Sequence, residues 1–295
     1  MYRFIILFIL LCGTNQSFAE NQLEQKIKSV LNDKKAIVGV SVLLEGKEIA
    51  SINGERHYPL LSVYKFPLAL AVLDHLDKKQ LPLSTKIAIS QADLQPDTYS
   101  PLRDKYPQGG IDLTISELLH YTVALSDNNT CDILFRYIGS PKKVDKYIKK
   151  LKINDISIVN TEQEMNENPD YIYQNWATPS AITRLLELFL KKELFSKEYQ
   201  DFLEQTLINT TTGLKKIRAL LPASVIVGNK TGNSPRTSSG MKIAENDLAF
   251  VRLPDGRQYT IAVLVSNSYE DDETNFGIIA QISKIVYDHL TGKLK

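Results

Sequence analysis

The chain has few cysteines and no excess of charge. Only two of its 295 residues are cysteine, Cys12 and Cys131, and its 35 lysines and arginines face 34 aspartates and glutamates. Without the first 19 residues, Cys131 alone remains and the charges balance, so no internal disulfide can form. We expect Cys131 to be a small buried apolar residue. A balanced charge also gives no electrostatic reason to bind nucleic acid or an anionic membrane.

Histidine is equally scarce, which argues against a metal hydrolase. The four histidines are scattered, with no H-x-H or H-E-x-x-H pair that would place two imidazoles on one metal ion; they are His57, His75, His120 and His289. We therefore expect no metal and no cofactor.

Long hydrophobic runs are absent as well. The longest, residues 4–11, is far shorter than the roughly 20 residues that span a bilayer. It follows Arg3 and precedes small residues, so residues 1–19 are predicted to be a cleaved signal peptide. The mature chain would then be exported to the periplasm, or secreted where no outer membrane exists, with no membrane attachment. A lipoprotein modified at Cys12 is the alternative, which the bulky Leu11 disfavours.

Strand patterns lie at both ends of the chain and helix patterns lie in the middle. Apolar and β-branched runs predict strands, and 3.6-residue periodicity or capping residues predict helices. A hairpin turn is indicated at Pro254-Asp255-Gly256-Arg257. Strands are expected at 37–44, 47–52, 224–228, 247–253 and 259–265, and helices at 22–31, 62–76, 115–121, 128–137, from 140, at 178–190 and at 276–290; residues 155–177 are expected to be a long loop.

These patterns predict an α+β fold. One antiparallel sheet, built from both chain ends and flanked by terminal helices, would satisfy the packing of layers. Residues 20–60 and 210–295 would form this discontinuous α/β lobe, and residues 61–209 an inserted all-helical lobe with an Ω-type loop at 160–178. We expect a monomer with a cleft between the two lobes.

Three short motifs carry the chemistry: Ser62-x-x-Lys65, Ser126-Asp127-Asn128 and Lys230-Thr231-Gly232. S-x-x-K alone is weak, because it also occurs at Ser140 and Ser239, and each motif alone has an ordinary reading as a helix cap, a turn or a strand end. Their order along the chain singles out Ser62, which precedes a strongly apolar helix. A serine needs an adjacent base to act as a nucleophile, and a spacing of three residues places serine and lysine on one helix face.

With this motif set, residues 20–290 resemble a class A serine β-lactamase of the serine β-lactamase/D,D-peptidase-like fold. The resemblance implies that Ser62 is acylated, that Lys65 helps deprotonate it, and that Ser126 protonates the leaving nitrogen. It further implies a substrate-binding set: Asn128 for the acylamide, Lys230, Thr231 and Gly232 for the carboxylate strand, the backbone N–H groups of Ser62 and Asn233 for the oxyanion, and Tyr99 in the cleft wall.

Glu162 and Asn166 match the family's E-x-x-x-N element in the Ω-type loop. By this resemblance Glu162 activates the hydrolytic water and Asn166 helps to hold it. Whether Lys65 or Glu162 is the acylation base stays open, whereas glutamate is accepted for deacylation.

Some positions depart from the common family pattern. Asn160 and Asn175 stand where many members have an Arg–Asp ion pair, so neutral hydrogen bonds are expected to hold the loop. No arginine stands at the usual position after the K-T-G motif, which leaves Arg236, Lys216 or Thr237 to assist in carboxylate binding. Gln174-Asn175-Trp176 and the apolar helix after Lys65 resemble the extended-spectrum branch.

The resemblance implies hydrolysis of penicillins and cephalosporins, with small-molecule β-lactams as partners and antibiotic resistance as the outcome. Two alternatives share the acylation machinery. A D,D-peptidase or transpeptidase would deacylate β-lactams slowly, and Glu162 argues against it. A β-lactam sensor domain would stay acylated and would normally need transmembrane segments.

Overall fold

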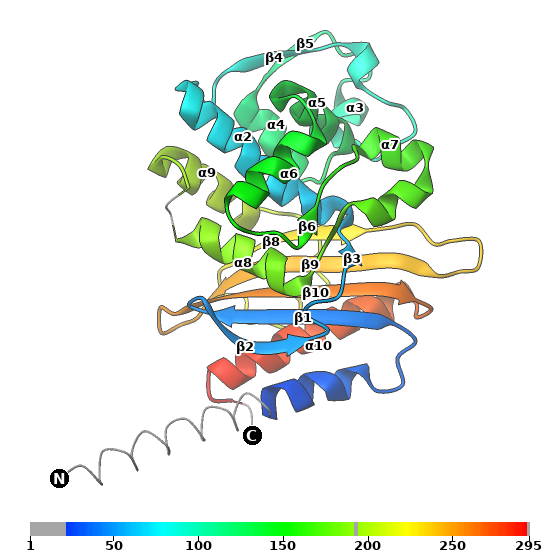
Figure 1. Cartoon of the computed structure of the whole chain (residues 1–295), viewed down its shortest axis with the longest axis vertical. Coiled ribbons are helices and arrows are strands. Elements are labelled where there is room, and N and C mark those ends of the chain that lie inside the picture. Colours follow the sequence, from blue (N-terminus) through cyan, green and yellow to red (C-terminus); the bar gives the residue numbers. More distant parts are fainter. Residues whose placement is uncertain (1–21, 192–193, 294–295) are drawn as a thin grey trace, which may run out of the picture.

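Five antiparallel strands from the two ends of the chain form one sheet in the computed structural model (Figure 1). The strand order is β2-β1-β10-β9-β8. The strands are β1 (Ile37–Leu44), β2 (Lys47–Ile52), β8 (Val227–Asn233), β9 (Lys242–Arg252) and β10 (Gln258–Ser268). The structure describes residues 22–191 and 194–293, so the predicted signal peptide of residues 1–19 lies outside the described residues. The predicted sheet, made from both chain ends, is confirmed.

Both faces of this sheet are buried, and alternate residues of each strand serve two different cores. In β10, Ile261, Val263 and Val265 pack with the helix of residues 22–31 and with α10 (Asp272–Leu290). Ala262 and Leu264 point the other way, into the core of the helical region. Figure 1 shows the two terminal helices together beneath the sheet and the helical region above it.

The helical region surrounds α2, which is buried over most of its length. A 3-10 turn, η1 (Leu61–Tyr64), leads into α2, and α8 packs directly on β1 and β10. Within the described residues every helix is too short or too polar to span a bilayer. The helices are α2 (Lys65–Lys79), α3 (Pro101–Lys105), α4 (Ile115–Val123), α5 (Asn128–Ile138), α6 (Pro141–Lys150), α7 (Glu162–Glu167), α8 (Pro179–Leu190) and α9 (Lys197–Ile208), with 3-10 turns η2 (Gln91–Asp93) and η3 (Pro169–Gln174).

Short strands pair within the helical region and at its border with the sheet. They are β4 (Lys86–Ile89) with β5 (Ile111–Thr114), and β3 (Tyr58–Pro59) with β7 (Trp176–Ala177) and β6 (Ile156–Ser157). Such two- to four-residue strands carry too little alternation to be seen in a sequence.

Several element boundaries also differ from the sequence-based expectation, including those of the following four elements. The helix expected from Ser62 starts as η1 and becomes α-helical only at Lys65, and the loop expected at 155–177 contains α7 and η3. The strand expected from Ser224 begins at Val227, because a turn closed by Val225 N–H on Pro222 O precedes it. The last helix starts at Asp272 rather than Phe276, since Asp271 caps it.

Candidate active site

Ser62 lies in η1, at the point where the chain turns into α2. The preceding residue, Leu61, has a φ of +48°, which is unusual for a residue other than glycine. Backbone strain of this kind costs about 1–3 kcal/mol and is typical of functional sites. The turn places Ser62 on the wall of a cleft of about 560 Å³.

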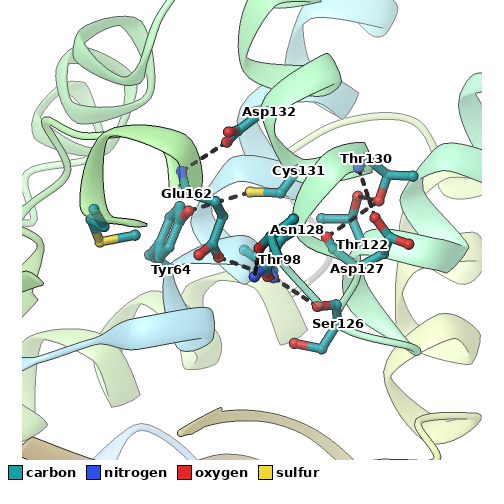
Figure 2. A network of polar contacts seen from close by, with 12 residues as sticks. Tyr64, Thr98, Thr122, Ser126, Asp127, Asn128, Thr130, Cys131, Asp132 and Glu162 are labelled. Atoms are coloured by element: carbon teal, nitrogen blue, oxygen red, sulfur yellow. Dashed lines mark hydrogen bonds and ion pairs between the residues drawn. The ribbon is translucent and has the colours of Figure 1, made fainter. Parts of the chain in front are cut away.

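Lys65 is completely buried, and its ammonium group joins three elements. The Nζ atom donates to Ser126 O at 2.8 Å and to Asn128 Oδ1 at 2.5 Å, and it lies 3.0 Å from Glu162 Oε1. Figure 2 shows the Glu162 and Asn128 side chains directed toward the same point beside Ser126. A buried ammonium requires such partners, because leaving it unpaired would be very costly.

Ser126 belongs to a tight loop before α5 and has a φ of +61°. Its Oγ accepts a hydrogen bond of 2.9 Å from Lys230 Nζ, which arrives from the sheet side of the cleft. The next residue, Asp127, fixes the loop from behind. Its carboxylate caps α5 by accepting the backbone N–H of Thr130. It also accepts the backbone N–H of Leu102 and the hydroxyl of Ser100.

The side chain of Asn128 is held at both ends. Its Oδ1 accepts from Lys65, and its Nδ2 donates to Thr98 Oγ1 at 2.7 Å. Its backbone N–H donates to the carbonyl of Tyr99, whose exposed side chain lines the cleft. The amide orientation of Asn128 is therefore fixed by an ammonium donor on one side and a hydroxyl acceptor on the other.

The Lys230-Thr231-Gly232 strand β8 runs along the edge of the sheet, against η1. A Cβ atom on Gly232 would lie 2.4 Å from Leu60 O, so only glycine allows this close approach. Lys230 is fully buried, and burial lowers its pKa well below the usual value, with the neighbouring charges of Lys65 and Lys216 acting in the same direction. An anion bound beside Lys230 would relieve this electrostatic penalty.

Glu162 is the first residue of α7, which Thr161 caps. The carboxylate of Asp132, on α5, accepts the backbone N–H of Glu162 and that of Gln163, both at 2.8 Å. Burial and then the nearby charge of Glu162 raise the pKa of Asp132 to about 7, against the lowering effect of the two N–H donors. The N-terminus of α7 is thus fixed to α5 through a single carboxylate.

Neutral hydrogen bonds hold the Ω-type loop, as the sequence predicts. Asn175 Oδ1 accepts from Val159 N at 2.8 Å and Asn160 N at 3.0 Å, and Asn175 Nδ2 donates to Asn160 O at 2.8 Å. Asn160 Nδ2 in turn donates to Tyr171 O. The buried amide pair closes the loop without any charge.

The structure brings the predicted site residues to two neighbouring cavities. Ser62, Ser126, Asn128, Thr231, Asn233 and Tyr99 line the main cleft. Glu162 and Asn166 line a smaller cavity of about 150 Å³ on the other side of Asn128, which borders both. Lys230 lies buried behind Ser126, and Gly232 lies against η1.

Three residues, Lys216, Arg236 and Thr237, are candidates to assist Lys230 in binding a carboxylate, and they lie in different places. Lys216 lines the cleft, pairs with Glu245 and donates to Asn246 O at 3.0 Å. Arg236 instead pairs with Asp272 outside the cleft, and the hydroxyl of Thr237 bonds to a neighbouring serine.

Sequence reasoning missed several residues of the site. Thr98 and Asp132 hold site residues from behind, and Thr212 Oγ1 lies 3.0 Å from Thr231 Oγ1 in the cleft. They lie outside the motifs, so no local pattern identifies them. Cys131 is buried as expected, with its sulfur 3.5 Å from Tyr64 OH. Among the described residues, no three His, Cys, Asp or Glu side chains converge closely enough to hold a metal ion.

Comparisons with known proteins agree with this arrangement. Residues 22–290 match the profile described as the beta-lactamase enzyme family. A β-lactamase of Bacteroides uniformis is 48% identical over 269 residues, 91% of each chain, and the β-lactamase VEB-1 of Pseudomonas aeruginosa is 40% identical over 92% of each chain.

Solved structures give the same result. The crystal structure of a class A β-lactamase from Bacteroides cellulosilyticus superimposes with a TM-score of 0.91 at 48% identity, covering 93% of this chain and 99% of that one. The TLA-1 extended-spectrum β-lactamase superimposes with a TM-score of 0.91 at 46% identity, covering 94% and 100%. With matches of this extent and with its three motifs meeting at one cleft, the chain belongs to the class A β-lactamase family.

Proposed function

We propose that this chain hydrolyses the β-lactam amide of penicillins and cephalosporins through an acyl-enzyme on Ser62, and thereby confers resistance to them. The observation that carries the proposal is the position of the Lys65 ammonium, one helical turn from Ser62 and 3.0 Å from Glu162 Oε1. A base adjacent to the nucleophile and a carboxylate adjacent to that base supply both halves of a hydrolytic cycle.

In the acylation half, Ser62 Oγ attacks the lactam carbonyl carbon. Its proton goes either to Lys65 as a neutral amine, formed when the ammonium passes a proton to Glu162, or through water to Glu162. The backbone N–H groups of Ser62 and Asn233 stabilise the oxyanion, in the manner of other acyl-transfer sites. Gly232 supports this geometry, because its missing side chain lets β8 lie against η1.

Ser126 passes a proton to the lactam nitrogen as the C–N bond breaks. Lys230 Nζ donates to Ser126 Oγ, so the hydroxyl proton of Ser126 is free to point into the cleft. Lys65 stabilises the same residue from the other side through the Ser126 carbonyl. The serine is therefore oriented by two cations and needs no large movement to act as the acid.

Lys230 and Thr231 bind the substrate carboxylate, and Lys216 supplies the second cation. Lys216, which is paired with Glu245, is the one of the three candidates that lines the cleft, whereas Arg236 pairs with Asp272 outside it. A carboxylate beside the two lysines would offset the like charges that lower the pKa of Lys230.

In the deacylation half, Glu162 removes a proton from a water molecule that attacks the acyl carbonyl, and the penicilloic acid leaves. Asn166 lines the same cavity as Glu162 and would help to orient the water. Asn128 borders both cavities, which supports its role in binding the acylamide group of the substrate between the nucleophile and the water.

Two variants test the proposal. Ser62→Ala is expected to abolish turnover of a chromogenic cephalosporin, and Ser140→Ala, at a second S-x-x-K sequence, is the matched control that retains it. Glu162→Gln is expected to acylate and then accumulate an adduct that intact-mass spectrometry detects. Full turnover by Ser62→Ala would refute the proposal, and rapid loss of the adduct would remove Glu162 from deacylation.

The same measurement separates the alternative functions. A persistent acyl-enzyme in the unaltered protein would favour a D,D-peptidase or a sensor, whereas complete turnover favours the hydrolase. We also propose that the mature protein is an exported monomer in the periplasm, which cell fractionation and analytical ultracentrifugation test.

A further inference from the structure

A groove lined with lysines lies between α2 and α6, which pack side by side (Figure 1). It measures about 330 Å³, and five lysines border it: Lys78, Lys79, Lys143, Lys146 and Lys150. It is distant from the cleft, because its His75 lies ten residues after Lys65 on the same helix, about 15 Å away. The groove therefore belongs to neither half of the hydrolytic cycle.

The positive charge of this groove is largely uncompensated. Its one acidic residue, Asp74, pairs with Lys78. Within residues 22–191 and 194–293, no acidic side chain forms an ion pair with Lys79, Lys143, Lys146 or Lys150. A general excess of basic residues does not explain the lysine cluster, because the whole chain has a net charge of only +1.

Helix dipoles explain only part of this cluster. Lys78, Lys79 and Lys150 lie in the last turns of their helices, where cations are favourable. Lys143 lies in the first turn of α6 beside Lys142, and that turn contains no acidic residue. A cation at this helix N-terminus is unfavourable, but the Lys143 ammonium lies against Gly139 at the C-terminal end of α5, where a cation is favourable. Among the groove lysines, Lys146 in the middle of α6 is the one that helix dipoles leave unexplained.

Two side chains on the groove wall, His75 and Tyr147, indicate its positive charge and its apolar character. The pKa of His75 is lowered first by burial and then by the charges of Lys79 and Lys143, while Asp74 opposes them. The ring of Tyr147 forms apolar floor beneath the lysines, and its buried hydroxyl has no hydrogen-bond partner among the described residues. The groove thus combines ammonium donors with an apolar floor.

From these observations we propose that the α2–α6 groove binds clustered phosphate groups. Several ammonium groups on adjacent helix faces match a ligand with two or more neighbouring phosphates, because each phosphate accepts from more than one donor. The repeat of lysines at positions 143, 146 and 150 keeps three of them on one face of α6. Polyphosphate in solution and the phosphates of anionic lipids share this chemistry.

The experiment compares two double variants of equal charge on the same helix. Lys143→Gln/Lys146→Gln removes two ammonium groups from the groove, and Lys142→Gln/Lys149→Gln removes two that do not line it. Isothermal titration with tripolyphosphate at low ionic strength is expected to show binding about tenfold weaker or more for the groove variant. The control variant is expected to bind nearly as the unaltered protein does.

A second arm identifies the source of the phosphates. Cosedimentation with phosphatidylglycerol vesicles, against phosphatidylcholine vesicles, reports binding to lipid phosphates. Loss of vesicle binding in the groove variant alone would support the proposal with a lipid as the ligand, even if tripolyphosphate binds poorly. Equal weakening in both variants, or no binding in either arm, would overturn it. Thermal unfolding and cephalosporin turnover, both expected to be unchanged, verify that the variants are folded.

Discussion

The contact between Asp132 and the start of α7 gives a sharp prediction about the rate of deacylation. Both oxygens of the Asp132 carboxylate accept backbone N–H groups, those of Glu162 and Gln163, at 2.8 Å. Asp132→Asn keeps the size of the side chain but turns an NH₂ group toward one of these donors. One charge-assisted hydrogen bond is lost, which is worth about 1.5–3 kcal/mol.

If the lost hydrogen bond keeps Glu162 in position to activate the water, the rate constant of deacylation falls roughly ten- to hundredfold. A rise of 1.36 kcal/mol in the barrier corresponds to a factor of ten. With Lys65 as the acylation base, acylation is expected to change little, because Asp132 makes no hydrogen bond to Ser62 or Lys65 among the described residues. Stopped-flow and quenched-flow mass spectrometry with a penicillin measure the two rate constants separately. Glu167→Gln, which removes a carboxylate from the far end of α7, is the control.

The pH dependence provides a second measure of the same contact. The pKa of Asp132 is raised to about 7, so the acid gains a proton as the pH falls through 7 and one oxygen ceases to be a free acceptor. Deacylation by the unaltered protein is expected to decline below pH 7, and this limb should be absent in Asp132→Asn. An equal fall in both rate constants, or an unchanged limb near pH 7, would refute the reasoning.

Three other substitutions test parts of the structure around the site. Gly232→Ala should lower kcat/KM for a penicillin about a hundredfold or more, because the new Cβ, 2.4 Å from Leu60 O, displaces β8 from the nucleophile; wild-type kinetics would contradict this contact. Asn175→Ala leaves two N–H groups and a carbonyl of the loop without partners, so urea unfolding should show a loss of about 3 kcal/mol or more, and an unchanged midpoint would count against the amide pair. Burial raises the pKa of Asp247 from 3.8 to about 6, so the folded state loses about 2 kcal/mol as the pH rises from 4 to 6, and Asp247→Asn should reduce this pH dependence of unfolding. Identical pH slopes for the two proteins would disprove it.

The sheet and the main helices could be predicted because their signals are local. Alternating apolar residues on both sides of Pro254-Asp255-Gly256-Arg257 define the β9–β10 hairpin. Thr178 followed by Pro179 defines the start of α8, and the structure has Thr178 Oγ1 accepting from Ala181 N. Each of these features depends on residues within a few positions of one another, which is the range at which sequence patterns operate.

The short elements near the site could not be predicted in the same way. The six residues of α7 contain only one buried side chain, Met165, so they show no helical periodicity. Their helix is stabilised by the Thr161 and Glu164 capping box and by Asp132 from another helix. Tertiary contacts supply what a six-residue helix lacks in intrinsic stability.

The choice among Lys216, Arg236 and Thr237 could not be made from the sequence, because it depends on where the fold places each side chain. The sequence places Arg236 and Thr237 nearest the K-T-G motif, and proximity along the chain favours them. The structure turns Arg236 toward Asp272, whereas Lys216, fourteen residues before Lys230, lines the cleft beside Thr231.

Asp132 is the strongest example of a residue that only the fold identifies. In the sequence it is one carboxylate in the apolar α5 pattern, thirty residues from Glu162, and such a charge is usually a solvated helix face. In the structure it lies against the N-terminus of α7, where a carboxylate is favoured by the free N–H groups and the helix dipole. Its two oxygens accept the backbone N–H groups of Glu162 and Gln163, so it would position the proposed catalytic carboxylate and take part in none of the bonds that form or break. Motifs identify the atoms that react, and the residues that hold those atoms in place are selected by packing between segments distant in sequence.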